Sequence, residues 1–135
     1  MRQLKFRAWD TRWERMEYFD SLYWFEENGV EYYTDSSGFI ISSSIYSDKY
    51  NAIVQQFTGI KDSSGRSIYE GDLIDFEVMV NYKEYEMLHN QEVMYDEELA
   101  MFVFGEDKWC MADHIKHETI KMVGNIYERN AEQST

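Results

Sequence analysis

Residues 56–74, QFTGIKDSSGRSIYEGDLI, carry the strongest sequence signals for the fold. Glycine recurs in it every six residues, at Gly59, Gly65 and Gly71. Because glycine adopts backbone angles that a β-carbon forbids, we expect these positions to fold the segment into tight reversals between short extended pieces.

Two local features strengthen that expectation. The side chain of Asp62 can accept a hydrogen bond from the backbone of Ser64 in an Asx-turn. The pair Gly71-Asp72 precedes an alternating apolar run, an arrangement typical of the reversal that starts a strand in small SH3-like barrels. In that strand we expect an inward face, made by Ile74, Phe76, Val78 and Val80.

This glycine-rich segment has two interpretations. The first is a structural framework of turns and strands. The second is a binding loop with exposed Asp62, Arg66, Tyr69 and Glu70. Both interpretations concern the same motif residues: Gly59, Asp62, Gly65, Arg66, Tyr69, Glu70, Gly71 and Asp72. A phosphate-binding loop is excluded, since no Lys-Ser or Lys-Thr pair follows the glycines and no long helix begins there.

Most of the remaining chain has the period-two pattern of β-strands. The clearest signal is the segment 22–33, where aromatic strands flank Asn28-Gly29, a pair that tolerates the positive φ angles of a type I′ hairpin turn. Other strands are expected at 3–9, 16–19, 52–57, 73–80, 91–95, 101–104 and 119–123, and one short helix at 111–117.

These elements predict a single mainly β domain. We expect a small, partly closed SH3-like barrel over Ile53–Val123, an additional N-terminal β-hairpin layer packed against it, and at most one or two short helices. Within the domain, residues 1–50 hold the N-terminal strands and hairpin, 51–128 the barrel portion, and 129–135 a polar tail. The part at 34–50, rich in Ser, Asp and Gly, is expected to be irregular apart from Phe39-Ile40-Ile41.

Charge limits the plausible partners of the chain. Its 135 residues carry a formal net charge of −13, so its field repels polyanions, and direct nucleic-acid binding is not expected. No window of eighteen uncharged apolar residues exists, and the N-terminus lacks a signal-peptide pattern. The one cysteine, Cys110, excludes an intramolecular disulfide and fits a reducing compartment. We therefore expect a soluble cytoplasmic protein without membrane contact.

Acidic side chains gather between residues 84 and 107. A solvated face is the simpler interpretation, and a DNA mimic that occupies a basic host protein is the alternative. The mimic requires regularly spaced rows of carboxylates on one exposed face, formed by Glu84, Glu86, Glu92, Asp96, Glu97, Glu98, Glu106 and Asp107.

Catalytic and metal-binding patterns are sparse. Cys110, His114 and His117 have a spacing that could place three ligands together, but a fourth ligand would have to come from Asp113 or Glu118. Packing of Cys110 in the core is the simpler interpretation, and a small metal protein or enzyme is the alternative. We assign no catalytic residue, metal ligand or cofactor-binding residue.

Aromatic residues are concentrated in the N-terminal third. In the predicted hairpin, Tyr23 and Phe25 point away from Trp24, so apolar groups lie on both faces. Either the hairpin is buried inside the monomer or another copy covers one face. We expect a homo-oligomer with Tyr23 and Phe25 as interface residues.

Three blocks together resemble the YopX family of small proteins encoded by bacteriophages and prophages. The central block, 56–74, is similar to the family form QFTGLKDKNGKEIYEGDIV, and the outer blocks are LKFRAWD at 4–10 and VGNIYE at 123–128. Departures are Met122-Val123 for Val-Ile, Arg129 for a common Asn, and an unmatched insert over Tyr33–Asn51. The resemblance implies a compact β-rich fold of phage origin and assigns no activity.

From these observations we expect a non-enzymatic, self-associating protein-binding module that binds a host or phage protein. The acidic DNA mimic and the metal protein or enzyme using Cys110, His114 and His117 stay as alternatives.

Overall fold

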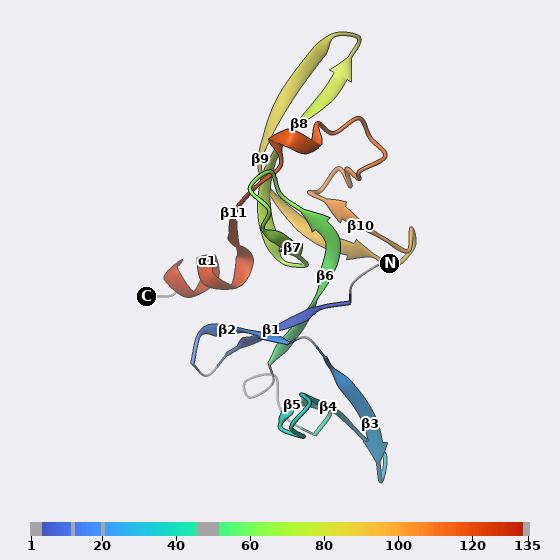
Figure 1. The fold of residues 1–135 in the computed structure, drawn as a ribbon, viewed down its shortest axis with the longest axis vertical. Helices are drawn as coiled ribbons and strands as arrows, with labels where there is room; N and C mark the ends of the chain where they lie inside the picture. The colour runs from blue at the N-terminus through green and yellow to red at the C-terminus, as the bar shows by residue number, and fades with distance from the viewer. Residues whose placement is uncertain (1–3, 12, 20, 46–51, 134–135) are drawn as a thin grey trace. The chain divides into compact units, whose positions relative to one another are not determined.

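The computed structural model describes residues 4–11, 13–19, 21–45 and 52–133, in two compact units, Met1–Phe57 and Thr58–Thr135. Strands dominate both units, with one short α-helix and one 3-10 turn among the described residues (Figure 1). The prediction of a mainly β fold is therefore confirmed. None of the described helices is long and apolar enough to cross a membrane.

The first sheet of the N-terminal unit contains β1 (Phe6–Asp10), β2 (Arg15–Phe19) and the first half of β6 (Ile53–Lys61). Strand β1 lies in the middle, and both neighbours pair with it antiparallel. The sequence predicted the first strand at 3–9. Its first residue, Gln3, lies outside the described residues, and the strand itself begins at Phe6.

Strand β1 is buried at Arg7 as well as at Ala8, which point to opposite faces of the sheet. Arg7 is 2% exposed and lies opposite Gln55 of β6. Its Nε donates a 2.6 Å hydrogen bond to the Gln55 side-chain oxygen. This bond gives a buried charged group a polar partner. Ala8 on the other face is also 2% exposed, so β1 is a central strand covered on both faces at these positions.

The second sheet of this unit has the order β3-β4-β5, with β3 (Tyr23–Glu27), β4 (Val30–Thr34) and β5 (Ile40–Ser43). The hairpin turn is the predicted one, since Asn28 and Gly29 have φ angles of 52° and 79°. Glu27 pairs with Val30 directly across that turn. The two-residue loop therefore sets the register of the whole hairpin.

The segment at 34–50 is more regular than its composition indicated. Ile40–Ser43 forms β5, and Ser43 is buried. The turn before it is held by Asp35, whose carboxylate accepts hydrogen bonds from the backbone N–H groups of Ser37 and Phe39. Pairing with β4 thus orders a serine-rich strand, while residues 46–50 of the segment predicted to be irregular lie outside the described residues.

The main sheet of the C-terminal unit has the order β10-β9-β8-β11 and curls into a half-barrel (Figure 1). Its strands are β8 (Asp72–Asn81), β9 (Glu84–Asp96), β10 (Met101–Phe104) and β11 (Lys121–Asn125). The short β7 (Ser67–Tyr69) follows β6 in the chain and pairs with it in the sheet of order β2-β1-β6-β7. This arrangement confirms the predicted partly closed barrel.

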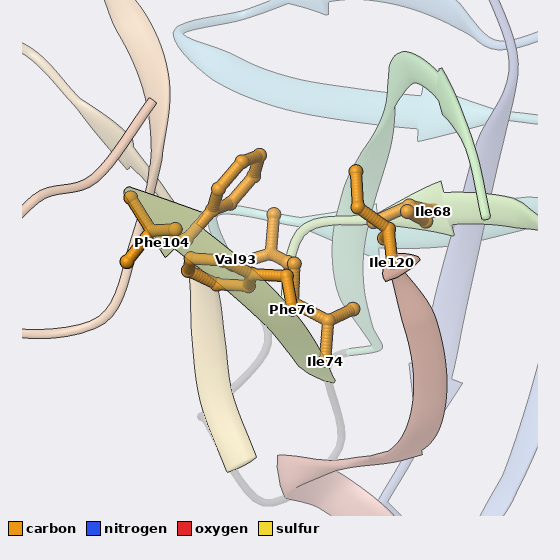
Figure 2. Packing of buried hydrophobic residues seen from close by; sticks show 7 residues of the cluster. Ile68, Ile74, Phe76, Val93, Phe104 and Ile120 are labelled. Carbon is orange, nitrogen blue, oxygen red and sulfur yellow. The ribbon is translucent and has the colours of Figure 1, made fainter. Parts of the chain in front are cut away.

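The core of this unit gathers side chains from β7, β8, β9 and β10 and from Ile120, just before β11. Phe76 and Phe104 meet edge to face at 5.7 Å between ring centroids. Figure 2 shows this cluster at close range. The fully buried set is Ile68, Ile74, Phe76, Val78, Val93, Phe104 and Ile120. Three of the four predicted inward residues of β8 belong to it, but Val80 is exposed, because the distal end of the β8–β9 hairpin faces solvent on both sides.

The helix predicted at 111–117 needs correction, and the described α-helix lies elsewhere. The segment predicted as a helix at 111–117 forms turns, because its backbone bonds to β8: Lys116 N–H donates to the Glu77 carbonyl, and Ile115 bridges Val78. The helix α1 spans Ile126–Gln133 and so includes residues 129–133 of the predicted polar tail. Asn125 caps α1 through a 2.9 Å bond from Glu128 N–H to its side-chain oxygen.

Candidate functional site

Asp62 joins two distant segments of the C-terminal unit. Its Oδ1 accepts hydrogen bonds from the backbone N–H groups of Ser64 and Arg66, at 3.0 and 2.9 Å, and from the Ser64 hydroxyl at 2.9 Å. Its Oδ2 accepts one at 3.0 Å from Met122 N–H of β11. The predicted Asx-turn is present, and the same carboxylate also fastens the turn to a strand sixty residues later.

Asp62 is only 5% exposed, and this burial opposes ionisation of its carboxyl group. The hydrogen bonds from Met122, Arg66 and Ser64 outweigh this burial and lower the pKa of the carboxyl below its ordinary value. Asp62 is therefore ionised at neutral pH, with its two oxygens directed at backbone N–H groups. These hydrogen bonds hold the turn and join it to β11.

Gly71 and Asp72 build the reversal between β7 and β8. Gly71 has a φ of 85°, and a β-carbon there would lie 2.6 Å from Cε2 of Tyr127. Its carbonyl accepts a 2.9 Å hydrogen bond from Ile126 N–H at the start of α1. The fully buried Asp72 accepts a 2.8 Å bond from Tyr69 N–H. The reversal thus packs closely against the helix.

The structure accordingly places the eight motif residues in a framework. Asp62 and Tyr69 are buried, which disagrees with the alternative interpretation of a binding loop that exposes them. Arg66 is exposed and Glu70 half-buried. Gly59 lies inside β6 with a φ of 87° rather than at a reversal, whereas Gly65 lies in a turn. The hydrogen bonds of Asp62 and the close approach of Gly71 to Tyr127 explain why these residue types occupy the two positions.

Two other carboxyls with lowered pKa also hold turns. A hydrogen bond from the Ser37 hydroxyl is the main cause that lowers the pKa of Asp35. A 2.7 Å ion pair with Lys108 is the main cause for Asp96, which also accepts a bond from Leu99 N–H. Each group is ionised for a structural reason, so none of these shifts marks a catalytic acid or base.

Cys110, His114 and His117 do not form a metal site in the structure. Among the described residues, which include all three, no group of three or more His, Cys, Asp or Glu side chains could hold a metal ion. Cys110 is half-buried, while both histidines are exposed. Asp113, considered as a fourth ligand, instead accepts a 2.9 Å hydrogen bond from Cys110 N–H.

The acidic side chains of 84–107 are divided among different elements. Glu84 and Glu86 share one face of β9, but Glu97 and Glu98 lie in one turn and Glu106 and Asp107 in another. Asp96 is paired with Lys108. This distribution lacks the regular row along one face that a DNA mimic requires.

The aromatic edge is the sequence-predicted site that the structure leaves open to a partner. We use this name for strand β3, Tyr23–Glu27, in which all five residues are exposed. Among the described strands, β3 pairs only with β4, so it forms one edge of its sheet. Tyr23 and Phe25 are 54% and 41% exposed, and Phe25 stacks on Tyr32 of β4 with ring centroids 4.9 Å apart.

Trp24, on the opposite face of the same strand, was not among the predicted interface residues. It is 54% exposed. The signal was available in the sequence, because strand alternation places residue 24 on the face opposite 23 and 25. The aromatic edge therefore exposes apolar side chains on both faces, and one side of its backbone pairs with no strand in the described part of the chain.

Comparisons with known proteins agree with this fold. The family model described as YopX protein matches residues 5–132, nearly the whole chain, as the resemblance predicted. No curated protein matches the chain. The crystal structure of protein EF1440 from Enterococcus faecalis is similar with a TM-score of 0.54 and 22% identity, over 94% of this chain and 95% of that chain. At this identity the likeness shows a shared fold alone.

Proposed function

The chain belongs to the YopX family, and we propose that it is a non-enzymatic protein-binding module that associates with itself through its N-terminal strands. The carrying observation is the aromatic edge, in which Tyr23, Trp24 and Phe25 are all at least 41% exposed. Large apolar side chains beside a free strand edge form a surface that natural proteins normally cover.

The charge of the chain supports a protein partner with a basic surface. A net charge of −13 attracts cationic surfaces and repels nucleic-acid phosphates. The resemblance to phage and prophage proteins, together with a single cysteine, favours a host or phage protein in the bacterial cytoplasm as that partner. The proposal involves no cofactor and no membrane.

Sedimentation velocity at micromolar concentration tests self-association. The wild type is expected to sediment as an oligomer, and Phe25→Glu as a folded smaller species, because an unpaired charge in a desolvated interface weakens association strongly. We expect a shift of at least a hundredfold in the association midpoint. Circular dichroism checks whether Phe25→Glu is folded.

Tyr82→Glu is the matched control, since it adds the same charge at an aromatic residue that is 84% exposed in the C-terminal unit. It is expected to sediment like the wild type. A wild type that is monomeric, or a Tyr82→Glu variant that dissociates as Phe25→Glu does, contradicts association through the aromatic edge.

A further inference from the structure

We propose that the aromatic edge pairs with a second copy of itself, antiparallel and about a two-fold axis at Phe25, so that two three-stranded sheets become one six-stranded sheet. This inference rests on the proposed function and adds to it the occupant, the direction and the register.

Hairpin geometry decides which backbone groups face the free edge. In an antiparallel hairpin with a two-residue loop, the pair next to the loop is hydrogen-bonded and the pairs then alternate. Here that pair is Glu27 with Val30. The backbone N–H and C=O groups of Trp24 and Glu26 therefore point to the free edge, where a new strand would meet them.

This alternation restricts the registers open to two identical antiparallel strands. Three registers align the outward groups. They place Trp24 opposite Glu26, Trp24 opposite its own copy, or Glu26 opposite its own copy. Placing Trp24 opposite Glu26 of the other copy overlaps all five residues of β3. The registers centred on Trp24 or on Glu26 leave part of the strand unpaired, and the second sets two Glu26 side chains against each other, which is unfavourable.

The register at Phe25 is also complementary in its side chains. The strand reads Tyr-Trp-Phe-Glu-Glu, so its aromatic half would meet the acidic half of the other copy. The Trp24 indole N–H and the Tyr23 hydroxyl are donors, and they would face the carboxylates of Glu26 and Glu27 respectively. Parallel in-register pairing would instead set each glutamate beside its own copy.

The centre of the interface would be apolar. Phe25 would lie opposite its own copy in a non-hydrogen-bonded pair, the closer of the two pair types. Because Phe25 stacks on Tyr32, the pairing would align four aromatic rings on one face of the joined sheet. A two-fold contact uses the same residues on both copies and closes without forming a fibre.

Cysteine cross-linking tests this register in a Cys110→Ser background, which removes the native thiol. Phe25→Cys is expected to form a disulfide-linked dimer under oxidised glutathione, because Cα atoms of a non-hydrogen-bonded pair lie about 4.5 Å apart, within disulfide range. Tyr23→Cys is the matched control, since its two copies would be separated by about 14 Å along the strand. We expect at least tenfold more linked dimer from Phe25→Cys.

The double variant Tyr23→Cys/Glu27→Cys keeps Phe25 in place and should also link, because residue 23 would face residue 27 of the other copy. Linked dimer from both designs, and little from Trp24→Cys, supports the proposal. Linking of Trp24→Cys alone overturns the register. An oligomer by sedimentation in which neither design links overturns pairing through β3 but leaves self-association standing, whereas a monomeric protein overturns both.

Discussion

The half-barrel core and the aromatic edge use similar residues in opposite ways. In the C-terminal unit, Phe76 and Phe104 are at most 1% exposed and touch each other. In the N-terminal unit, Phe25 also contacts another ring but is 41% exposed on an edge strand. Apolar composition alone therefore does not say whether a strand stabilises its own domain or is available to another chain.

The two regions differ in how many neighbouring segments surround the strand. Strand β8 has β9 on one side, and β11 and the segment around Ile115 on the other, and its inner face meets side chains from β7 and β10. Strand β3 has only β4 beside it among the described strands. The core residues should therefore determine folding stability, and those of the aromatic edge should determine association.

Phe76→Ala should show the largest effect on folding. The substitution leaves a cavity in a fully buried cluster and is expected to cost about 3–5 kcal/mol in the free energy of unfolding. Urea denaturation followed by circular dichroism measures it. The matched variant Phe25→Ala, studied at concentrations where the protein is dissociated, should cost clearly less; equal losses would remove the distinction between the two regions.

Asp62→Asn should have the next largest effect, and its size should depend on pH. Because the pKa of Asp62 is lowered in the folded protein, its ionised form contributes stability fully above the unfolded pKa of about 3.9. That contribution disappears as the pH falls through the still lower folded pKa. At pH 7 we expect a loss of about 1.5–3 kcal/mol, the range for hydrogen bonds to a charged group.

Urea denaturation of wild type and Asp62→Asn at pH 7 and near pH 3 checks this expectation, and the difference between them should shrink in acid. Asp35→Asn is the counterpart in the N-terminal unit, where the carboxylate holds a turn at the surface. It should perturb unfolding less than Asp62→Asn. A difference for Asp62→Asn that stays constant with pH would contradict the role assigned to its charge.

Gly71→Ala compares turns in the two regions and should give the smallest difference. Both Gly71 and Gly29 have positive φ angles, so alanine is strained at either position by about 1–2 kcal/mol. Only at Gly71 would the new β-carbon also meet Tyr127, at 2.6 Å, while nothing lies within 4 Å at Gly29. In thermal unfolding, we expect Gly71→Ala to lower stability by about 1 kcal/mol more than Gly29→Ala does. Equal effects would mean that Tyr127 moves away freely.

Much of the fold was predictable because local and tertiary preferences agree. Asn28-Gly29 specifies its hairpin by itself, and alternation in β8 predicts Ile74, Phe76 and Val78 as buried. The failures occur where distant segments decide. Residues 111–117 form turns because they bond to β8, and β5 is ordered by pairing with β4. The helix α1 was missed although Asn125 and Glu128 carry a helix-start signal.

The candidate site was predictable in part for the same reason. Exposure of Tyr23 and Phe25 follows from alternation in a strand with aromatic residues on both faces. The second bond of Asp62, to Met122 N–H, joins residues sixty positions apart and leaves no local pattern. Its burial could not be deduced from the turn, so its role as a link within the framework became visible only in the structure.

Hydrogen exchange at two protein concentrations tests whether the aromatic edge is covered on self-association. Peptides covering residues 22–27 and 73–79 are compared above and below the association midpoint found by sedimentation. We expect protection of 22–27 at the higher concentration and its loss on dilution, with 73–79 equally protected at both. Protection of 22–27 that is the same at both concentrations, in a protein that dissociates between them, would contradict the assignment of the aromatic edge to self-association.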